Sequence, residues 1–127
     1  MRHALEVTQL TLAVARLGPA DPVPAWALGG SFSSVTRTAT ELSVVCDAAL
    51  VPPDVRAERD WAAVHVAGTL DFALVGVLAG ITGALAGVGV SCFVLSTHDT
   101  DWILVRRTAL DTALSAWRAH GYLVRER

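Results

Sequence analysis

The chain has 127 residues, a hydrophobic content of 53%, a charged content of 17% and a formal net charge of −2. This length supports one hydrophobic core, or two small lobes that share one core. The apolar composition excludes a disordered chain and indicates that much of the apolar surface is buried, including burial against another subunit. The ten basic residues are all arginines dispersed along the chain, which gives no basis for attraction to nucleic acid or to an anionic membrane.

The first half of the chain is predicted to be rich in strands. Alternating apolar and polar residues predict strands over residues 6–15, 32–38 and 41–46. The last two strands are close enough in sequence to form a hairpin. Residues 25–28 can form one helical turn, and the polar residues 54–60 predict a surface link. This half resembles a shortened copy of the more regular pattern that follows.

The second half predicts the order strand, helix, strand, strand, helix, strand. The strands are expected over residues 61–67, 90–96, 102–105 and 122–124. The first helix is expected to begin at Thr69 or Asp71, whose side chains can cap it, and to end at Gly87-Val88-Gly89. The second is expected over residues 108–119. This order is the βαββαβ pattern of ferredoxin-like α+β folds, with two helices on one face of a four-stranded antiparallel sheet.

Residues 70–95 contain a single charged residue, Asp71, and are long enough to cross a bilayer. The glycine pair in Gly87-Val88-Gly89 interrupts the run, and the residues after it favour a strand. We therefore expect a buried helix, a turn and a buried strand rather than a membrane span. The N-terminus lacks the continuous apolar region of a signal peptide, which predicts a cytoplasmic protein.

The sequence offers no convincing catalytic or metal-binding motif. Cys46 and Cys92 lie in apolar runs and are expected to be buried thiols, and no Cys or His pair has the spacing of a zinc site. The histidines form no obvious catalytic pair, and a phosphate-binding loop is absent. We therefore expect a protein that is not an enzyme and that carries no cofactor. The four tryptophans are expected to anchor the core or a dimer interface.

Several segments of the chain resemble ACT domains, in particular the small bacterial tandem-ACT proteins related to the CASTOR arginine sensors. The resemblance lies in residues 41–46, 68–72, 78–80, 87–91 and 96–105. It implies an ACT domain over residues 61–127, preceded by a shortened ACT-like half over residues 1–60.

The resemblance also implies a function. ACT domains bind free amino acids or similar small effectors at interfaces between domains or subunits, and they report binding through association or through the activity of an attached enzyme. We therefore expect a non-catalytic, homodimeric regulatory module that acts on a separate protein or on its own assembly. The alternative is an assembly module that keeps the fold and has lost the ligand.

Three places can supply the contacts of an amino-acid site. Backbone N–H groups at the expected helix start suit a carboxylate, which singles out Thr69, Leu70, Asp71 and Phe72. An exposed strand edge at Ser43 and Val44 offers both N–H and C=O groups. The acidic turn, with Thr97, His98, Thr100 and Asp101, offers the carboxylates of Asp99 and Asp101 to an ammonium or a cationic side chain.

By the resemblance, Asp101 falls where the arginine sensors place a carboxylate against the ligand's side chain, and His98 falls at an aromatic position near it. Ser43 and Val44 fall on the strand whose backbone contacts the ligand. Two positions depart from those sensors. Leu74 stands where they have an acidic residue, and Asp71 stands where they have glycine. These differences leave the identity of the effector open, and Asp71 can serve as a helix cap instead of a ligand contact.

Overall fold

The computed structural model describes residues 3–126. These residues form two compact units: unit 1 contains residues 3–9 and 62–126, and unit 2 contains residues 10–61. Two long strands, β1 (Ala4–Leu17) and β4 (Ala57–Val66), contribute residues to both units. The start of β1 therefore belongs with the C-terminal part of the chain, whereas the sequence led us to group it with residues 1–60.

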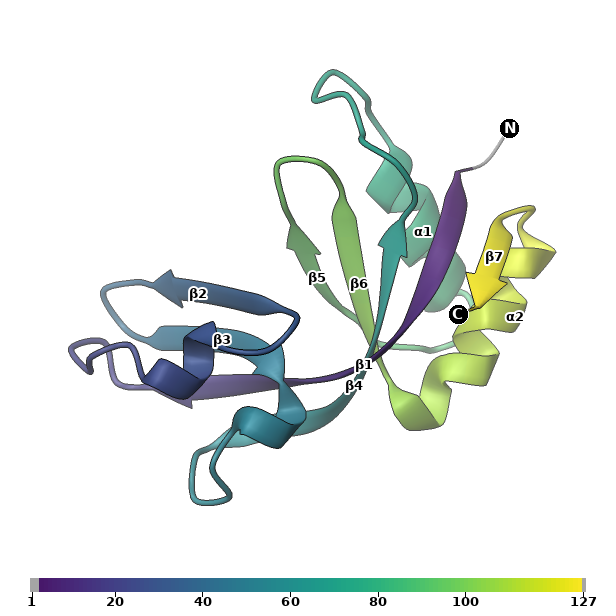
Figure 1. The fold of residues 1–127 in the computed structure, drawn as a ribbon. Helices are drawn as coiled ribbons and strands as arrows, with labels where there is room; N and C mark the ends of the chain where they lie inside the picture. Colours follow the sequence, from purple (N-terminus) through teal and green to yellow (C-terminus); the bar gives the residue numbers. More distant parts are fainter. Residues whose placement is uncertain (1–2, 127) are drawn as a thin grey trace. The chain divides into compact units, whose positions relative to one another are not determined.

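After β4, unit 1 follows the predicted order of elements (Figure 1). The elements are α1 (Val77–Ala86), β5 (Phe93–Ser96), β6 (Asp101–Arg106), the 3-10 turn η3 (Arg107–Ala109), α2 (Leu110–Ala119) and β7 (Leu123–Glu126). Strands β5 and β6 form the expected antiparallel hairpin, in which Ser96 pairs with Asp101 and Phe93 pairs with Leu104. Among the described residues, no helix is long and apolar enough to cross a membrane.

The sheet of unit 1 contains one strand more than the sequence predicted. Its strand order is β7-β1-β4-β6-β5, because the N-terminal part of β1 lies between β4 and β7. This part of β1 runs parallel to β7, with Ala4 paired to Leu123 and Val7 paired to Glu126. The sheet therefore differs from the expected four-stranded antiparallel sheet by one added strand and by the parallel pairing of β1 with β7. The extra strand is stabilised by burial, since Leu5 and Val7 belong to the hydrophobic core.

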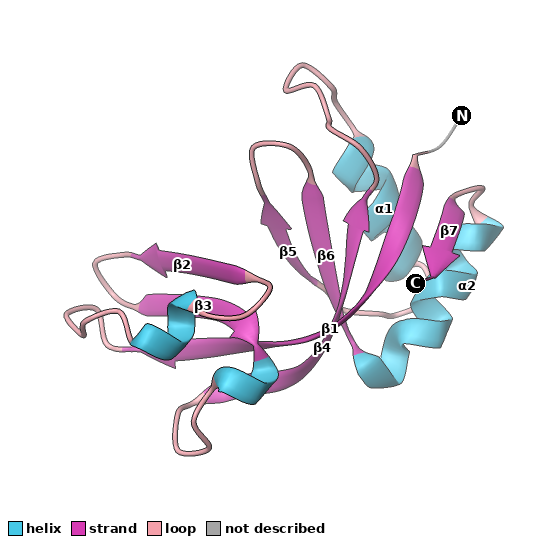
Figure 2. Ribbon diagram, in the orientation of Figure 1, coloured by secondary structure: helices cyan, strands magenta, loops and turns pink. Residues whose placement is uncertain are grey.

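Both helices of unit 1 pack on the same face of this sheet (Figure 2). The core between helices and sheet is built from alternate residues of the strands and from one stripe of each helix. Its fully buried side chains include Leu5, Val64, Val66, Ile81, Leu85, Ile103, Val105 and Trp117. This packing fixes the ends of β4, α1 and the β5–β6 hairpin, which border the pocket described below.

Unit 2 is built from strands and 3-10 turns. Its further elements are η1 (Ala25–Leu28), β2 (Ser33–Arg37), β3 (Leu42–Asp47) and η2 (Ala48–Leu50), and its strand order is β2-β3-β1-β4. Strand β3 is antiparallel to both β1 and β2. One face of the sheet carries a small apolar cluster with Ala13, Ala15, Ala27, Val44, Cys46 and Val51 buried in it.

Strand β4 begins at Ala57, within the stretch that the sequence predicted to be a surface link. The side chain of Arg59 explains this local order. Its guanidinium donates hydrogen bonds to the carbonyl oxygens of Val51, Pro52 and Val55 at 3.1, 2.7 and 2.8 Å. These bonds satisfy the carbonyls of the preceding turn and fix the chain as it enters the strand.

Candidate ligand-binding pocket

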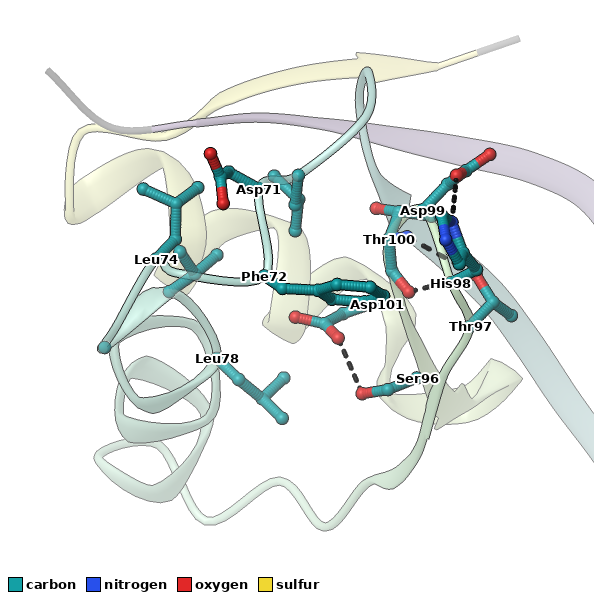
Figure 3. Close-up of a pocket in the computed structure, with 13 residues that line it drawn as sticks. Asp71, Phe72, Leu74, Leu78, Ser96, Thr97, His98, Asp99, Thr100 and Asp101 are labelled. Carbon is teal, nitrogen blue, oxygen red and sulfur yellow. Dashed lines mark hydrogen bonds and ion pairs between the residues drawn. The ribbon is translucent and has the colours of Figure 1, made fainter.

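A pocket of about 320 Å³ opens in unit 1 between the segment after β4, the start of α1 and the β5–β6 turn (Figure 3). We call it the acidic pocket. It brings together most of the residues that the sequence singled out, from two separate stretches of the chain: Leu70, Asp71, Phe72, Thr97, His98, Thr100 and Asp101.

The first wall of the acidic pocket is a segment without regular structure, residues 67–76, which we call the entry segment. The sequence predicted that α1 begins within it, at Thr69 or Asp71. This prediction is wrong, because α1 begins at Val77 and is preceded by Gly76 in the left-handed conformation, with φ of 78°. Helices in proteins are stabilised mainly by burial of an apolar face. Phe72 and Val75 are 77% and 92% exposed, so burial would stabilise a helix in this segment little.

Asp71 therefore caps no helix. One of its carboxylate oxygens, Oδ1, accepts a hydrogen bond from the backbone N–H of Ala73 at 2.8 Å, which is a local turn within the entry segment. A second bond within this turn joins the N–H of Leu74 to the carbonyl of Asp71 at 3.0 Å. Thr69, also predicted to contact the ligand, does not line the pocket.

The end of β4 and the first half of the entry segment are tied to the β5–β6 turn by three contacts. The backbone N–H of Leu70 donates to the carbonyl of Asp99 at 2.6 Å, and the hydroxyl of Thr100 donates to the carbonyl of Val66 at 2.7 Å. The rings of Phe72 and His98 meet edge to face, with centroids 4.9 Å apart and planes at 72°. These contacts hold the two walls of the pocket together.

The second wall carries most of the negative charge. The Asp101 carboxylate accepts a hydrogen bond from the Ser96 hydroxyl at 2.6 Å, across the paired ends of β5 and β6 (Figure 3). Asp99 and His98 form a pair at 2.9 Å and are largely exposed. With Asp71, the pocket has three carboxylates and no arginine among its lining residues. Its potential is therefore negative, which suits an ammonium or guanidinium group.

The start of α1 favours a negatively charged group, in contrast to the carboxylates, which favour a positively charged one. Gly76, Val77 and Leu78 line the pocket, and the first hydrogen bond of the helix runs from the N–H of Gly80 to the carbonyl of Gly76 at 3.2 Å. The N–H groups of a first helical turn have no acceptor within their own helix, and they carry the positive end of the helix dipole. The pocket thus combines carboxylates with a helix start that favours an anion.

The predicted backbone-binding edge at Ser43 and Val44 is not an edge. Strand β3 lies between β1 and β2, and Val44 pairs with Ala15 on one side and Val35 on the other. The Val44 side chain is fully buried. Both residues belong to unit 2, whereas every residue that lines the acidic pocket belongs to unit 1. Ser43 lines a second, smaller hollow in unit 2.

Sequence reasoning missed Gly76, Val77, Leu78 and Ser96 as pocket residues. Two signals point to them. Gly76 directly precedes the helical run, where a left-handed residue can end an irregular segment. Ser96 and Asp101 flank the four-residue turn at positions that pair in a hairpin, so their side chains lie on the same face.

The two cysteines are free thiols outside the acidic pocket. Burial raises the pKa of the Cys46 thiol, and the negative charge of Asp47 raises this pKa further. Burial also raises the pKa of the Cys92 thiol. Both thiols are therefore weak nucleophiles at neutral pH. Within residues 3–126, no group of His, Cys, Asp and Glu side chains is arranged to hold a metal ion.

Comparison with known proteins assigns this arrangement to a family. Residues 56–118 match the ACT domain model, and residues 11–54 match a second model described as an N-terminal domain. The Agobacterium tumefaciens protein Atu0741 is 33% identical to the chain, with a TM-score of 0.94 over 100% of this chain and 95% of that one. Residues 56–118 belong to the ACT domain family.

Other solved structures share the fold at lower identity. The Vibrio cholerae protein VC0802 is 18% identical, with a TM-score of 0.73 over 91% of this chain and 88% of that one. The ligand-free regulatory subunit of aspartate kinase from Thermus thermophilus is 14% identical, with a TM-score of 0.67 over 95% and 99%. No curated protein sequence matches the chain. The predicted ACT-type α+β fold is confirmed.

Proposed function

We propose that this ACT protein is a regulatory module that binds a free amino acid in the acidic pocket and performs no catalysis itself. One observation carries the proposal: a single pocket of about 320 Å³ joins the start of α1 to the carboxylates of Asp71, Asp99 and Asp101. A free amino acid carries the two complementary charges. The similarity to an aspartate kinase regulatory subunit supports a regulatory role.

In the proposed complex, the ligand carboxylate lies against the N–H groups of Val77 and Leu78, and a cationic group lies against Asp101. The apolar part of the ligand packs on the Leu70 and Leu78 side chains, which line the pocket. Charge-assisted hydrogen bonds contribute about 1.5–3 kcal/mol each. Three of them at the upper end of this range provide the roughly 8 kcal/mol that corresponds to a micromolar dissociation constant.

We also propose that the chain acts as a homodimer in the cytoplasm, and that its output is a separate regulated protein or its own assembly. The entry segment supports an interface, since it exposes three apolar residues, Phe72, Leu74 and Val75. We further propose that the chain is functionally related to the tandem-ACT group of the CASTOR sensors, with Asp101 in the position of their ligand-binding carboxylate.

A thermal-shift screen with the twenty amino acids tests ligand binding. A ligand at about 100 times its dissociation constant should stabilise the protein by about 2.7 kcal/mol. If no amino acid raises the melting temperature, the sensor proposal fails and the ligand-free assembly module takes its place. Light scattering at micromolar concentration tests the dimer separately, and a monomeric mass with and without the amino acid would exclude it.

A further inference from the structure

Unit 2 carries a cluster of charged side chains on the sheet face opposite its apolar cluster. The cluster lies on three neighbouring strands, β3, β1 and β4, and on the residues that directly precede two of them. Residues two positions apart share one face of a strand, which groups Val14 with Arg16 in β1, Ser43 of β3 with the preceding Glu41, and Glu58 of β4 with the preceding Arg56. The intervening residues Ala15 and Ala57 belong to the apolar cluster or pack against it.

Backbone pairing brings these charges together. Arg16 lies directly opposite Ser43 in the register of β1 and β3, and its backbone N–H donates to the carbonyl of Arg56 at 2.9 Å. The Arg16 guanidinium is also held in place, because it donates to the carbonyls of Thr40 at 2.9 Å and Leu17 at 3.3 Å. Hydrogen bonds to backbone carbonyls therefore fix the position of the Arg16 guanidinium.

The same residues line a hollow of about 210 Å³, with Val14 as an apolar contact. Its charged lining consists of two arginines, Arg16 and Arg56, and two glutamates, Glu41 and Glu58. A ligand with only a negative charge would be attracted by the arginines and repelled by the glutamates. A ligand with only a positive charge would be attracted by the glutamates and repelled by the arginines. A molecule that carries both charges can gain from both pairs.

We propose that this hollow is a second small-molecule site, which takes a small zwitterion such as a free α-amino acid. The carboxylate of the ligand pairs with Arg56 and Arg16, its ammonium pairs with Glu41 and Glu58, and a short apolar side chain contacts Val14. Because these charges lie at a solvent-exposed sheet face, binding is expected to be weak, with a dissociation constant on the order of millimolar. The site is independent of the acidic pocket, since its residues all belong to unit 2.

The test is a nuclear magnetic resonance titration of the full ¹⁵N-labelled chain with three probes: L-alanine, acetate and methylammonium. L-alanine is expected to shift the amides of residues 14–16, 41–43 and 56–58 with saturation. Acetate and methylammonium each carry only one of the two charges, and they are expected to shift these amides far less at equal concentration. Equal shifts from acetate, or no shift in these residues with L-alanine, would overturn the proposal.

Two variants separate this site from the acidic pocket. Arg56→Gln is expected to weaken the L-alanine shifts in unit 2 by about fivefold, the loss of one exposed charge pair. Asp101→Ala should leave those shifts unchanged, because Asp101 lies in unit 1. The amide spectrum itself reports whether each variant is folded. An unchanged L-alanine affinity in folded Arg56→Gln would refute the site, whatever the acidic pocket binds.

Discussion

The indole N–H of Trp117 donates a hydrogen bond to the backbone carbonyl of Ile81 at 3.0 Å, and both side chains are fully buried. This bond joins α2 to α1 in the core of unit 1. The indole ring packs with the sheet residues of the same cluster, so its polar atom is satisfied where water is excluded. Trp117 therefore fixes the position of α1, whose first turn lines the acidic pocket.

Trp117→Phe is expected to lower the free energy of unfolding by about 1–3 kcal/mol, because it removes a buried hydrogen bond and leaves a small cavity. Urea unfolding monitored by circular dichroism measures the change. Trp26→Phe is the matched control, since Trp26 is only partly buried against the cluster of unit 2. Equal losses in the two variants would contradict the role assigned to Trp117.

Gly76→Ala and Gly83→Ala are expected to change stability in opposite directions. A Cβ atom at either position meets no atom within 4 Å, so neither substitution creates a clash. Gly76 has φ of 78°, and alanine in this conformation costs about 1–2 kcal/mol. Gly83 lies inside α1, where alanine should stabilise by about 0.5–1 kcal/mol. Thermal melts of the two variants test this, and a stabilised Gly76→Ala would be inconsistent with the start of α1 described above.

Asp101→Ala is expected to abolish the thermal shift caused by a cationic amino acid while changing the melting temperature of the ligand-free protein little. The carboxylate is partly exposed, and its bond to the Ser96 hydroxyl lies at the turn end of the hairpin. Loss of such a surface contact usually changes stability by no more than about 0.5 kcal/mol.

Asp54→Ala is the control for Asp101→Ala, because Asp54 is an exposed carboxylate of unit 2 outside both pockets. It should keep the ligand response. If the ligand-free Asp101→Ala protein melts far below the wild type, Asp101 has a structural role. If it keeps the full ligand response, the cationic group of the ligand binds elsewhere.

Stability is expected to fall in alkaline solution through Cys46. Burial and Asp47 raise the pKa of this thiol in the folded state, so the folded protein holds the proton more tightly than the unfolded chain. The associated stabilisation is fully present below the thiol pKa of the unfolded chain, about 8.5, and is lost as pH rises through the higher folded value. Urea unfolding from pH 7 to pH 10 should therefore show a smaller alkaline loss in Cys46→Ala than in the wild type. Identical pH profiles would rule out this contribution.

Local patterns predicted the order of elements in unit 1 because each pattern has a local cause. The four-residue turn between Ser96 and Asp101 fixes a hairpin register, and the stripe that includes Ile81 and Leu85 has the period of a helix. The same patterns singled out seven of the residues that line the acidic pocket, because the segment after β4 and the β5–β6 turn lie at the same end of the sheet.

Two features of unit 1 could not be predicted from local sequence patterns. The pairing of β1 with β7 joins residues more than a hundred positions apart, and such a pairing leaves no periodic signal in either segment. The start of α1 was misplaced because Leu74 continues the helical spacing of the stripe, although it is 48% exposed and lies before Gly76. Sequence spacing alone does not distinguish an exposed apolar residue from a buried one.

The insertion of β1 between β4 and β7 makes unit 1 discontinuous along the chain, because the residues of unit 2 come between its first strand and its other elements in the sequence. No single cut can release unit 1 intact. A fragment that starts at residue 61 would keep both helices but would present two rows of unpaired backbone groups, on β4 and on β7, separated by the width of one strand. A synthetic peptide of residues 3–9 would be able to fill this slot, so the fold of unit 1 should be recoverable by fragment complementation.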